Sequence, residues 1–140
     1  MTRLRDARGI SPEDLGRLKD LGITTSEDLL ARGAAFEGRE TIAAQTGIAE
    51  ITITRWVGIA DLERLNGVAW DYATLLSAAG IGSIPELGLA QSELLLARMA
   101  DVNQSQQIVK RLPTAKQVQS WIQAAKQTPG VLSYRPQETF

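Results

Sequence analysis

Two pairs of glycines are the part of this sequence whose residue types and spacing could do chemistry. Gly9 is followed by Gly22, and Gly67 is followed by Gly80, in each case 13 residues later. A glycine-containing turn that leads into a helix can bind phosphate, because its backbone N–H groups can donate and glycine lets the ligand come close. Phosphate binding is therefore the first function to consider.

The residues that follow each leading glycine disfavour phosphate binding. Phosphate-binding hairpins usually have a second glycine two residues later, but Ser11 and Ala69 occupy that position here. Carboxylates then follow at Glu13 and Asp71, where a cation would be needed to attract an anion. Ser11 is a typical N-cap, since its hydroxyl can accept a hydrogen bond from the first turn of a helix. The spacing therefore predicts helical hairpins more strongly than a phosphate site.

The residue types most often used in catalysis are missing. The chain of 140 residues contains no histidine and no cysteine, which removes the commonest general base and all thiolate chemistry. The carboxylates, hydroxyls and amines that remain form no recognisable catalytic or metal-binding spacing. We therefore expect no enzyme activity, no metal, no cofactor and no small-molecule substrate.

Helical signals run through the whole chain. Apolar residues recur at helical spacing, and Ser11 and Pro12 place a cap and a proline at the start of a helix that Gly22 ends. Thr114 and Gln117 have the spacing of a capping box at the start of another helix. No segment alternates over enough residues to form a sheet. The sequence predicts an all-α fold.

An internal repeat is the most informative feature of the sequence. The glycine pairs match at a shift of 58 residues, and Trp56 matches Trp121 at a shift of 65. The spacing within each copy is that of a helix-hairpin-helix. We predict tandem duplicated helix-hairpin-helix units, residues 4–62 and 63–127, that form one compact helical domain over residues 1–127. The two tryptophans should then occupy equivalent buried positions.

Three stretches of the sequence resemble a known family. They are Gly22–Leu30, Trp56–Leu62 and Arg111–Ile122. Through them, residues 5–127 resemble a bacterial domain family of unknown function with paired helix-hairpin-helix motifs. The resemblance implies the helical fold, and it implies no particular activity.

Positive charge is concentrated near the end of the chain. Residues 1–102 carry 10 basic and 15 acidic side chains, whereas residues 103–137 carry five basic side chains and no acidic one. Such a strip can attract an acidic partner or a nucleic acid, and it can also be a solvated helix face. The candidates for weak nucleic-acid binding without base specificity are Lys110, Arg111, Lys116 and Lys126, with Arg3, Arg5 and Arg8 as additions.

Aromatic residues favour a protein partner as the main ligand. Trp70 and Tyr72 stand in the first turn after the second hairpin, and Trp and Tyr are common interface anchors. Residues 128–140 form an extended, proline-containing tail that carries Tyr134 and Phe140. The favoured function is a scaffold or binding module that docks on another protein or assembly. The alternatives are a Trp70 that packs between the two copies and a tail that is disordered.

Nothing in the sequence indicates insertion into a membrane. Its apolar stretches are far shorter than the roughly 20 residues that a bilayer span needs. Residues 1–6 lack the apolar core of a signal peptide. We expect a cytoplasmic protein.

Overall fold

Helices make up nearly all the regular structure of the chain. The computed structural model describes residues 1–136, and within that range it has eight α-helices, one short 3₁₀ turn and a single β-bridge between Arg3 and Thr25. The prediction of an all-α fold is confirmed. In chain order the elements are η1 (Leu4–Asp6), α1 (Pro12–Asp20), α2 (Ser26–Gly33), α3 (Phe36–Thr46), α4 (Glu50–Leu62), α5 (Trp70–Ala78), α6 (Ile84–Gly88), α7 (Ser92–Gln106) and α8 (Ala115–Gln127).

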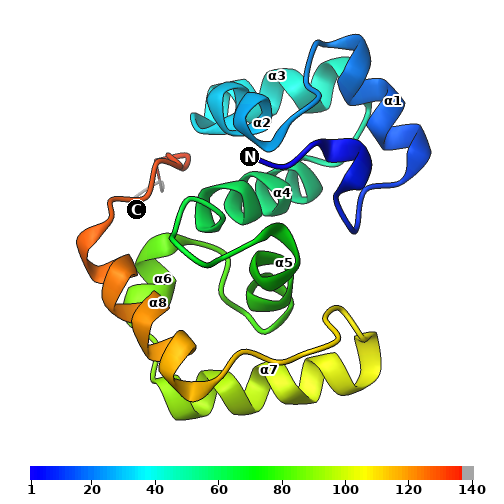
Figure 1. The fold of residues 1–140 in the computed structure, drawn as a ribbon. Coiled ribbons are helices and arrows are strands. Elements are labelled where there is room, and N and C mark those ends of the chain that lie inside the picture. The colour runs from blue at the N-terminus through cyan, green and yellow to red at the C-terminus, as the bar shows by residue number, and fades with distance from the viewer. Residues whose placement is uncertain (137–140) are drawn as a thin grey trace.

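Helix α4 is the centre of the fold. In Figure 1, α1, α2 and α3 lie above α4, and the remaining helices lie below it. α4 packs on α2 and α3 on one side and on α5 and α6 on the other. Every residue from Trp56 to Leu62 is buried, as is expected of a helix that is covered on all sides. α4 thereby joins the two halves of the chain, residues 1–62 and 63–127, into one core.

Local geometry recurs along the chain at two fixed spacings. α1 and α5 each have nine residues and begin 58 positions apart, and α4 and α8 each have 13 residues and begin 65 positions apart. Gly22 and Gly80 both have left-handed backbones, with φ of 79° and 100°. The residues that follow them, Ile23 and Ile81, donate their N–H groups to carbonyls five residues earlier, at 3.0 and 2.9 Å. The same glycine-dependent helix end is therefore formed in both halves.

The additional residues of the second half lie after α6. α3 has 11 residues and α7 has 15, and both end at a residue with a left-handed backbone, Gly47 and Gln107. Residues 108–114 then lead to α8, whereas only residues 48 and 49 separate Gly47 from α4. The second half thus has a longer helix and a longer loop than the first at corresponding points.

The tryptophans on the central and last helices are buried. Trp56 on α4 and Trp121 on α8 are each 3% exposed. The ring of Trp121 lies 5.3 Å from that of Tyr72 on α5, with an angle of 52° between their planes. Both tryptophans belong to the continuous apolar core.

The first turn of α2 is closed by reciprocal hydrogen bonds. Thr25 Oγ1 accepts from the Asp28 N–H at 3.0 Å, and the Asp28 carboxylate accepts from the N–H groups of Thr24 and Thr25 at 3.1 and 3.2 Å. The hydrogen bond from the Thr24 backbone is the main reason that the pKa of Asp28 lies below its ordinary value of 3.8. Glu86 accepts from the Gly82 N–H at 2.9 Å ahead of α6 in the same way.

Replacing either buried tryptophan with alanine should destabilise the fold. Trp56→Ala and Trp121→Ala each remove a buried ring and leave a cavity, which should lower the free energy of unfolding by about 3–5 kcal/mol. Chemical denaturation followed by circular dichroism measures the loss. Leu89→Ala is the control, because Leu89 is exposed and its removal should change stability by less than about 0.5 kcal/mol. An unchanged unfolding midpoint in Trp56→Ala would contradict the assignment to the core.

The stabilisation by Asp28 should disappear in acid. Because its pKa is lower in the folded chain than in the unfolded chain, the carboxylate contributes fully above about pH 4 and loses its effect as the pH falls through the folded pKa. Asp28→Ala should therefore cost about 0.5–2 kcal/mol at neutral pH, and this difference should shrink in strong acid. Urea unfolding over a pH series measures it, with Glu27→Ala as the exposed neighbour outside the cap. A difference that stayed constant into strong acid would contradict the assignment.

Candidate functional site

Trp70 belongs to the core. It is 4% exposed, and its indole N–H donates to the Arg8 carbonyl at 3.0 Å. This contact sets the first turn of α5 against the loop that precedes α1, so the ring packs between the two halves of the chain. The expectation that Trp70 stands on the surface is wrong, because its apolar ring and its polar N–H both find partners inside the chain.

Tyr72 is half-buried and is also used within the chain. Its hydroxyl donates to the Arg111 carbonyl at 3.1 Å, and its ring packs on Trp121. These two contacts hold the loop between α7 and α8 against α5. Tyr72 therefore stabilises the fold through contacts within the chain, and its ring is only partly accessible to a partner.

The segment after α8 lies against the central helix. In Figure 1, this segment runs from the end of α8 toward α2 and α4. The Val131 N–H donates to Asp61 Oδ2 at 3.2 Å, and Asp61 also accepts from Arg64 at 2.7 Å. Asp61 is fully buried on α4, and Arg64 reaches the Pro129 carbonyl at 3.2 Å. The start of the tail is thus tied to a buried carboxylate.

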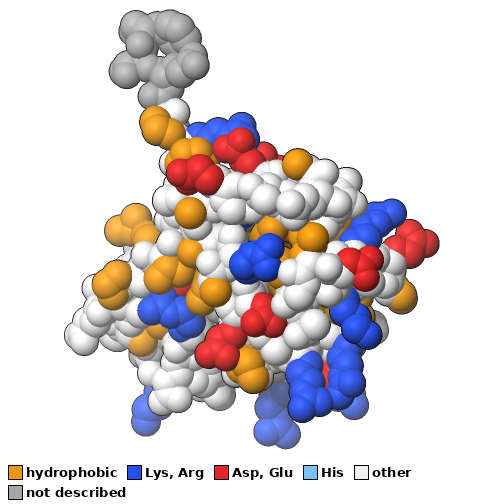
Figure 2. Space-filling view, turned by 90° about the horizontal axis from the view of Figure 1, so that it is seen from above, with side chains coloured by type: hydrophobic (Ala, Val, Ile, Leu, Met, Phe, Trp, Pro, Cys, Tyr) orange, Lys and Arg blue, Asp and Glu red, His pale blue; other side chains and the backbone are white. Residues whose placement is uncertain are grey.

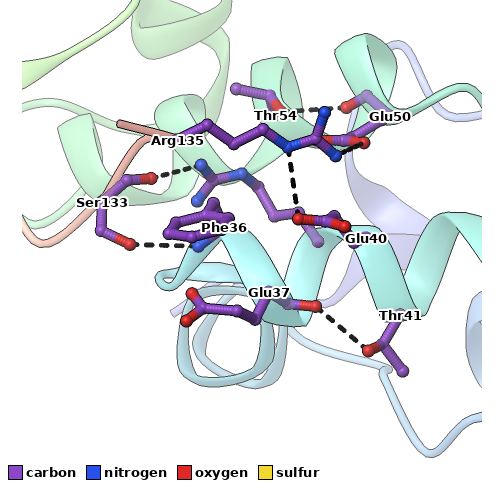
Figure 3. A network of polar contacts seen from close by, with 9 residues as sticks. Phe36, Glu37, Glu40, Thr41, Glu50, Thr54, Ser133 and Arg135 are labelled. Atoms are coloured by element: carbon purple, nitrogen blue, oxygen red, sulfur yellow. Dashed lines mark hydrogen bonds and ion pairs between the residues drawn. The ribbon is translucent and has the colours of Figure 1, made fainter. Parts of the chain in front are cut away.

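Ser133 ties the tail to the junction between α2 and α3. Its N–H donates to the Ala34 carbonyl at 2.8 Å, and its hydroxyl accepts from the Phe36 N–H at 3.1 Å. Its carbonyl accepts from the guanidinium of Arg39. Figure 3 shows the contact between Ser133 and Phe36. All three polar groups of Ser133 are therefore used by the first half of the chain.

Arg39 is the buried cation beneath the tail. It is 2% exposed, and one of its terminal nitrogens donates to the carbonyls of Gly33 and Ala34 at 2.7 and 2.8 Å. Its Nε has no hydrogen-bond partner among the described residues. Its guanidinium lies 5.6 Å from the ring centre of Tyr134. Burial, and then the charge of Glu86, raise the pKa of the Tyr134 hydroxyl, while Arg39 opposes the shift.

The last described residues add exposed ion pairs. Arg135 contacts Glu40 at 3.2 Å and Glu50 at 3.0 Å, as Figure 3 shows. Exposed pairs of this kind contribute at most about 1 kcal/mol each. Tyr134 is exposed but is held next to Arg39, and Phe140 lies outside the described residues. Residues 129–135 therefore contact the chain's own helices at several points, while Tyr134 keeps an exposed ring.

Sequence analysis overlooked the two buried charges that hold the tail. In the sequence, both charged residues stand at positions of a helix where apolar residues are expected, and this could have indicated that they are buried. Arg39 comes three positions before Ile42, so that both share one buried face of α3. Asp61 lies inside the run from Trp56 to Leu62. A charged residue at such a position needs a polar partner, and here the partners come from the tail.

The basic residues near the end of the chain are exposed but dispersed. Lys110 and Arg111 lie in the loop before α8, and Lys116 is in the first turn of that helix. Lys126 is in its last turn, roughly 15 Å further along the axis. None of the four forms an ion pair within residues 1–136. They therefore offer three cations at one end of α8 and a separate one at the other.

A second group of cations surrounds a hollow on the first half. The hollow has a volume of about 360 Å³ and lies between the N-terminal segment, α1 and the start of α2. Figure 2 shows Lys and Arg side chains spread over the face that is seen from above, several of them at its lower right, with Asp and Glu side chains among them. We call this hollow the basic cavity. Its lining residues are Arg3, Arg5, Leu15, Lys19, Ile23, Thr24 and Thr25.

An apolar hollow lies on the second half, between α6 and α7. It has a volume of about 620 Å³. Leu89 at the end of α6 is 88% exposed, and Leu94 in the first turn of α7 is 52% exposed. Ile81 and Leu95 are buried beside them. We call this hollow the α6–α7 groove, and it is lined by Ile81, Glu86, Leu89, Leu94, Leu95 and Arg98, among others.

Residues 1–136 contain neither a metal-binding cluster nor a membrane-spanning helix. No group of three or more acidic side chains there is placed to hold a metal ion. None of the helices in this part of the chain combines the length and the apolar character that crossing a membrane requires.

Removing the tail should destabilise the domain. A chain that ends after Gln127 loses the hydrogen bonds of Asp61 and Arg39 to the tail and exposes the surface beneath it. We expect its free energy of unfolding to fall by about 1–3 kcal/mol. Urea denaturation measures the change, and a chain that ends after Pro136 is the matched control and should be unchanged. Equal stability of the two truncated chains would show that the tail contacts contribute nothing.

Comparison with known proteins identifies a family and no function. No curated protein and no solved structure matches the chain. Residues 8–128 match a family described as a domain of unknown function, DUF4332. These residues include all eight helices of the described structure. Because the match covers most of its length, the chain belongs to the DUF4332 family.

Proposed function

We propose that this chain is a non-catalytic binding module that docks on another protein through the α6–α7 groove. Of the aromatic residues that first suggested docking, Trp70 is buried and Tyr72 is half-buried, so this proposal rests on another surface. The groove is the largest of the hollows considered above, and its apolar side chains are the most exposed. The partner could be a single protein or a larger assembly.

The exposure of Leu89 is the observation that carries this proposal. Leu89 is 88% exposed and Leu94 is 52% exposed, and both side chains line the groove. Exposed apolar patches are typical of interaction sites when polar residues surround them. Glu86 and Arg98 supply a carboxylate and a guanidinium at the edge of the groove. Burying one leucine on a partner would contribute about 1.5–3 kcal/mol.

The partner that fits this groove best is an amphipathic helix. Within residues 1–136 no strand offers a free edge, so a partner cannot bind here by adding a strand to a sheet. Recognition must then occur through side chains. The groove offers aliphatic side chains from the end of one helix and the beginning of the next. A helix with apolar residues on one face can fill such a groove and meet Glu86 and Arg98 with its flanking charges.

We propose further that the fold is a tandem duplication of helix-hairpin-helix units. The equal lengths of α1 and α5, and of α4 and α8, support the proposal. So does the shared left-handed glycine at Gly22 and Gly80. In this interpretation the hairpins serve as a scaffold. The first has a capping hydroxyl at Ser11 where a phosphate would bind, and the second has Ala69.

Weak nucleic-acid binding is the second candidate function. Lys110, Arg111 and Lys116 are exposed near one end of α8 and have no ion-pair partner within residues 1–136. Cations in this arrangement attract phosphates without base specificity, and such binding falls steeply with salt. The dispersion of the charges and the distance to Lys126 make this the weaker proposal.

Charge placed in the groove should abolish docking without unfolding the domain. Leu89→Glu and Leu94→Glu should each weaken capture of a partner at least about tenfold, because each replaces a buried leucine in the complex. Ile51→Glu is the matched control, since Ile51 is an aliphatic residue outside the groove whose 78% exposure lies between those of Leu89 and Leu94. All three variants should unfold like the original chain. Pull-down from the native host, with and without nuclease, followed by mass spectrometry, measures capture.

Two outcomes would contradict the docking proposal. Equal loss of capture in Ile51→Glu and in the groove variants would show that the effect is not specific to the groove. Capture that disappeared after nuclease treatment would favour the nucleic-acid function instead.

A further inference from the structure

We infer that the basic cavity on the first half of the chain is a second binding site, which takes an acidic peptide segment with one aliphatic side chain. The inference does not depend on the α6–α7 groove, because the two hollows share no lining residue. It rests on three cations around an apolar floor, in a cavity whose backbone is fixed by hydrogen bonds.

The cations of the cavity are held by rigid elements. The Leu4 N–H donates to the Thr24 carbonyl at 2.9 Å, and the Ser26 N–H donates to the Thr2 carbonyl at 2.8 Å. These hydrogen bonds fix the segment that carries Arg3 and Arg5, while Leu4 between them is buried. Lys19 comes from the last turn of α1. The positive charges therefore approach the cavity from two separate elements.

These three cations are not neutralised by neighbouring acids. Within residues 1–136, the side chains of Arg3, Arg5 and Lys19 form no ion pair. On the same helix, Arg17 is instead paired with Asp14 at 3.1 Å. No carboxylate lines the cavity. The ligand is thus expected to carry the opposite charge.

The floor of the cavity is apolar. Leu15, which is half-buried against the core, supplies accessible aliphatic surface, and Ile23 is fully buried behind the cavity wall. A volume of about 360 Å³ is sufficient for one side chain and its polar neighbours. Aliphatic groups at the base and cations at the rim fit a ligand with the reverse arrangement, an apolar group between acids.

Asp28 shows why the ligand is not a phosphate chain. Its carboxylate accepts from the backbone N–H groups of Thr24 and Thr25 and lies beside the cavity wall. This carboxylate is charged at neutral pH, and its backbone hydrogen bonds lower the pKa of Asp28 further. The N–H groups at the start of α2 are therefore occupied, and a densely charged nucleic-acid backbone would meet a negative charge there. Separate carboxylates on flexible side chains can contact Arg3, Arg5 and Lys19 and avoid Asp28.

A synthetic peptide tests this site directly. The probe is a fluorescein-labelled, C-terminally amidated peptide with one leucine flanked on each side by two glutamates, and binding is measured by fluorescence anisotropy. The control peptide has serine in place of the leucine, and a single-stranded oligonucleotide of equal charge is the third probe. We expect the leucine peptide to bind at least about fivefold more tightly than either control.

Variants of the chain locate the binding. Lys19→Glu should weaken binding of the leucine peptide about tenfold, because it replaces attraction by repulsion at the rim. Arg17→Glu changes the charge of the same helix by the same amount and should weaken binding less than about twofold. Leu89→Glu should leave binding unchanged, which separates this site from the α6–α7 groove.

Three results would overturn the inference. The serine peptide could bind as well as the leucine peptide, which would leave only a diffuse attraction between charges. The oligonucleotide could bind more tightly than the peptide and be weakened by Lys19→Glu, which would make the cavity a nucleic-acid site. Lys19→Glu and Arg17→Glu could have equal effects, which would place the binding outside the cavity. Failure of docking at the α6–α7 groove would leave the inference unaffected.

Discussion

The fold depends on how closely other segments approach the central helix. A β-carbon at Gly58 would lie 2.3 Å from the Gly82 carbonyl oxygen, and one at Gly33 would lie 2.6 Å from a methyl group of Val57. Both distances are far below van der Waals contact. Glycine at these positions lets α2 pack on one side of α4 and lets the loop before α6 pack on the other. Because both halves bury their apolar surface on this one helix, neither half has a complete core without it.

The shared core determines which residues are available for function. Trp70 and Tyr72 are used to hold α5 against the first half and against the loop before α8. Asp61 and Arg39 are buried polar groups that need partners, and the tail supplies them. Several charged and aromatic side chains therefore form contacts within the chain and are not available to a ligand. Within residues 1–136, the surfaces whose side chains have no internal partner include the basic cavity, the α6–α7 groove and the cations Lys110, Arg111 and Lys116.

Local rules predicted the helices well and the long-range contacts poorly. The caps at Ser11 and Thr114 and the helix end at Gly22 depend on residues within a few positions, and the structure forms all three. The position of Trp70 depends on a carbonyl 62 residues away in sequence. The position of the tail depends on Arg39, which lies 94 residues away from Ser133. Spacing along one segment contains no information on such pairs.

The two candidate sites were hidden from sequence analysis for a related reason. Leu89 is one of many leucines that follow one another at helical spacing, and its exposure reflects the lack of any element that covers it. Arg3, Arg5 and Lys19 are separated in sequence, and only the hydrogen bonds between the N-terminal segment and the residues before α2 bring them together. The sequence shows each of these residues, but it does not show which residues lie next to it in space.

Under the proposed duplication, the two halves share a framework and differ in their surfaces. Leu18 corresponds to Leu76 at the shift of 58 residues, and both are buried. The surface residues at the same shift have changed in character.

Arg5 corresponds to Glu63 and Lys19 corresponds to Ser77, so these two cations of the basic cavity have no cationic counterparts in the second half. Leu89 corresponds to Ala31, so the protruding leucine exists only in the second. A core that tolerates such exchanges can present two chemically different sites on one scaffold. The geometry that the two halves share therefore accounts for the fold. We expect ligands to bind at the surface residues in which the two halves differ.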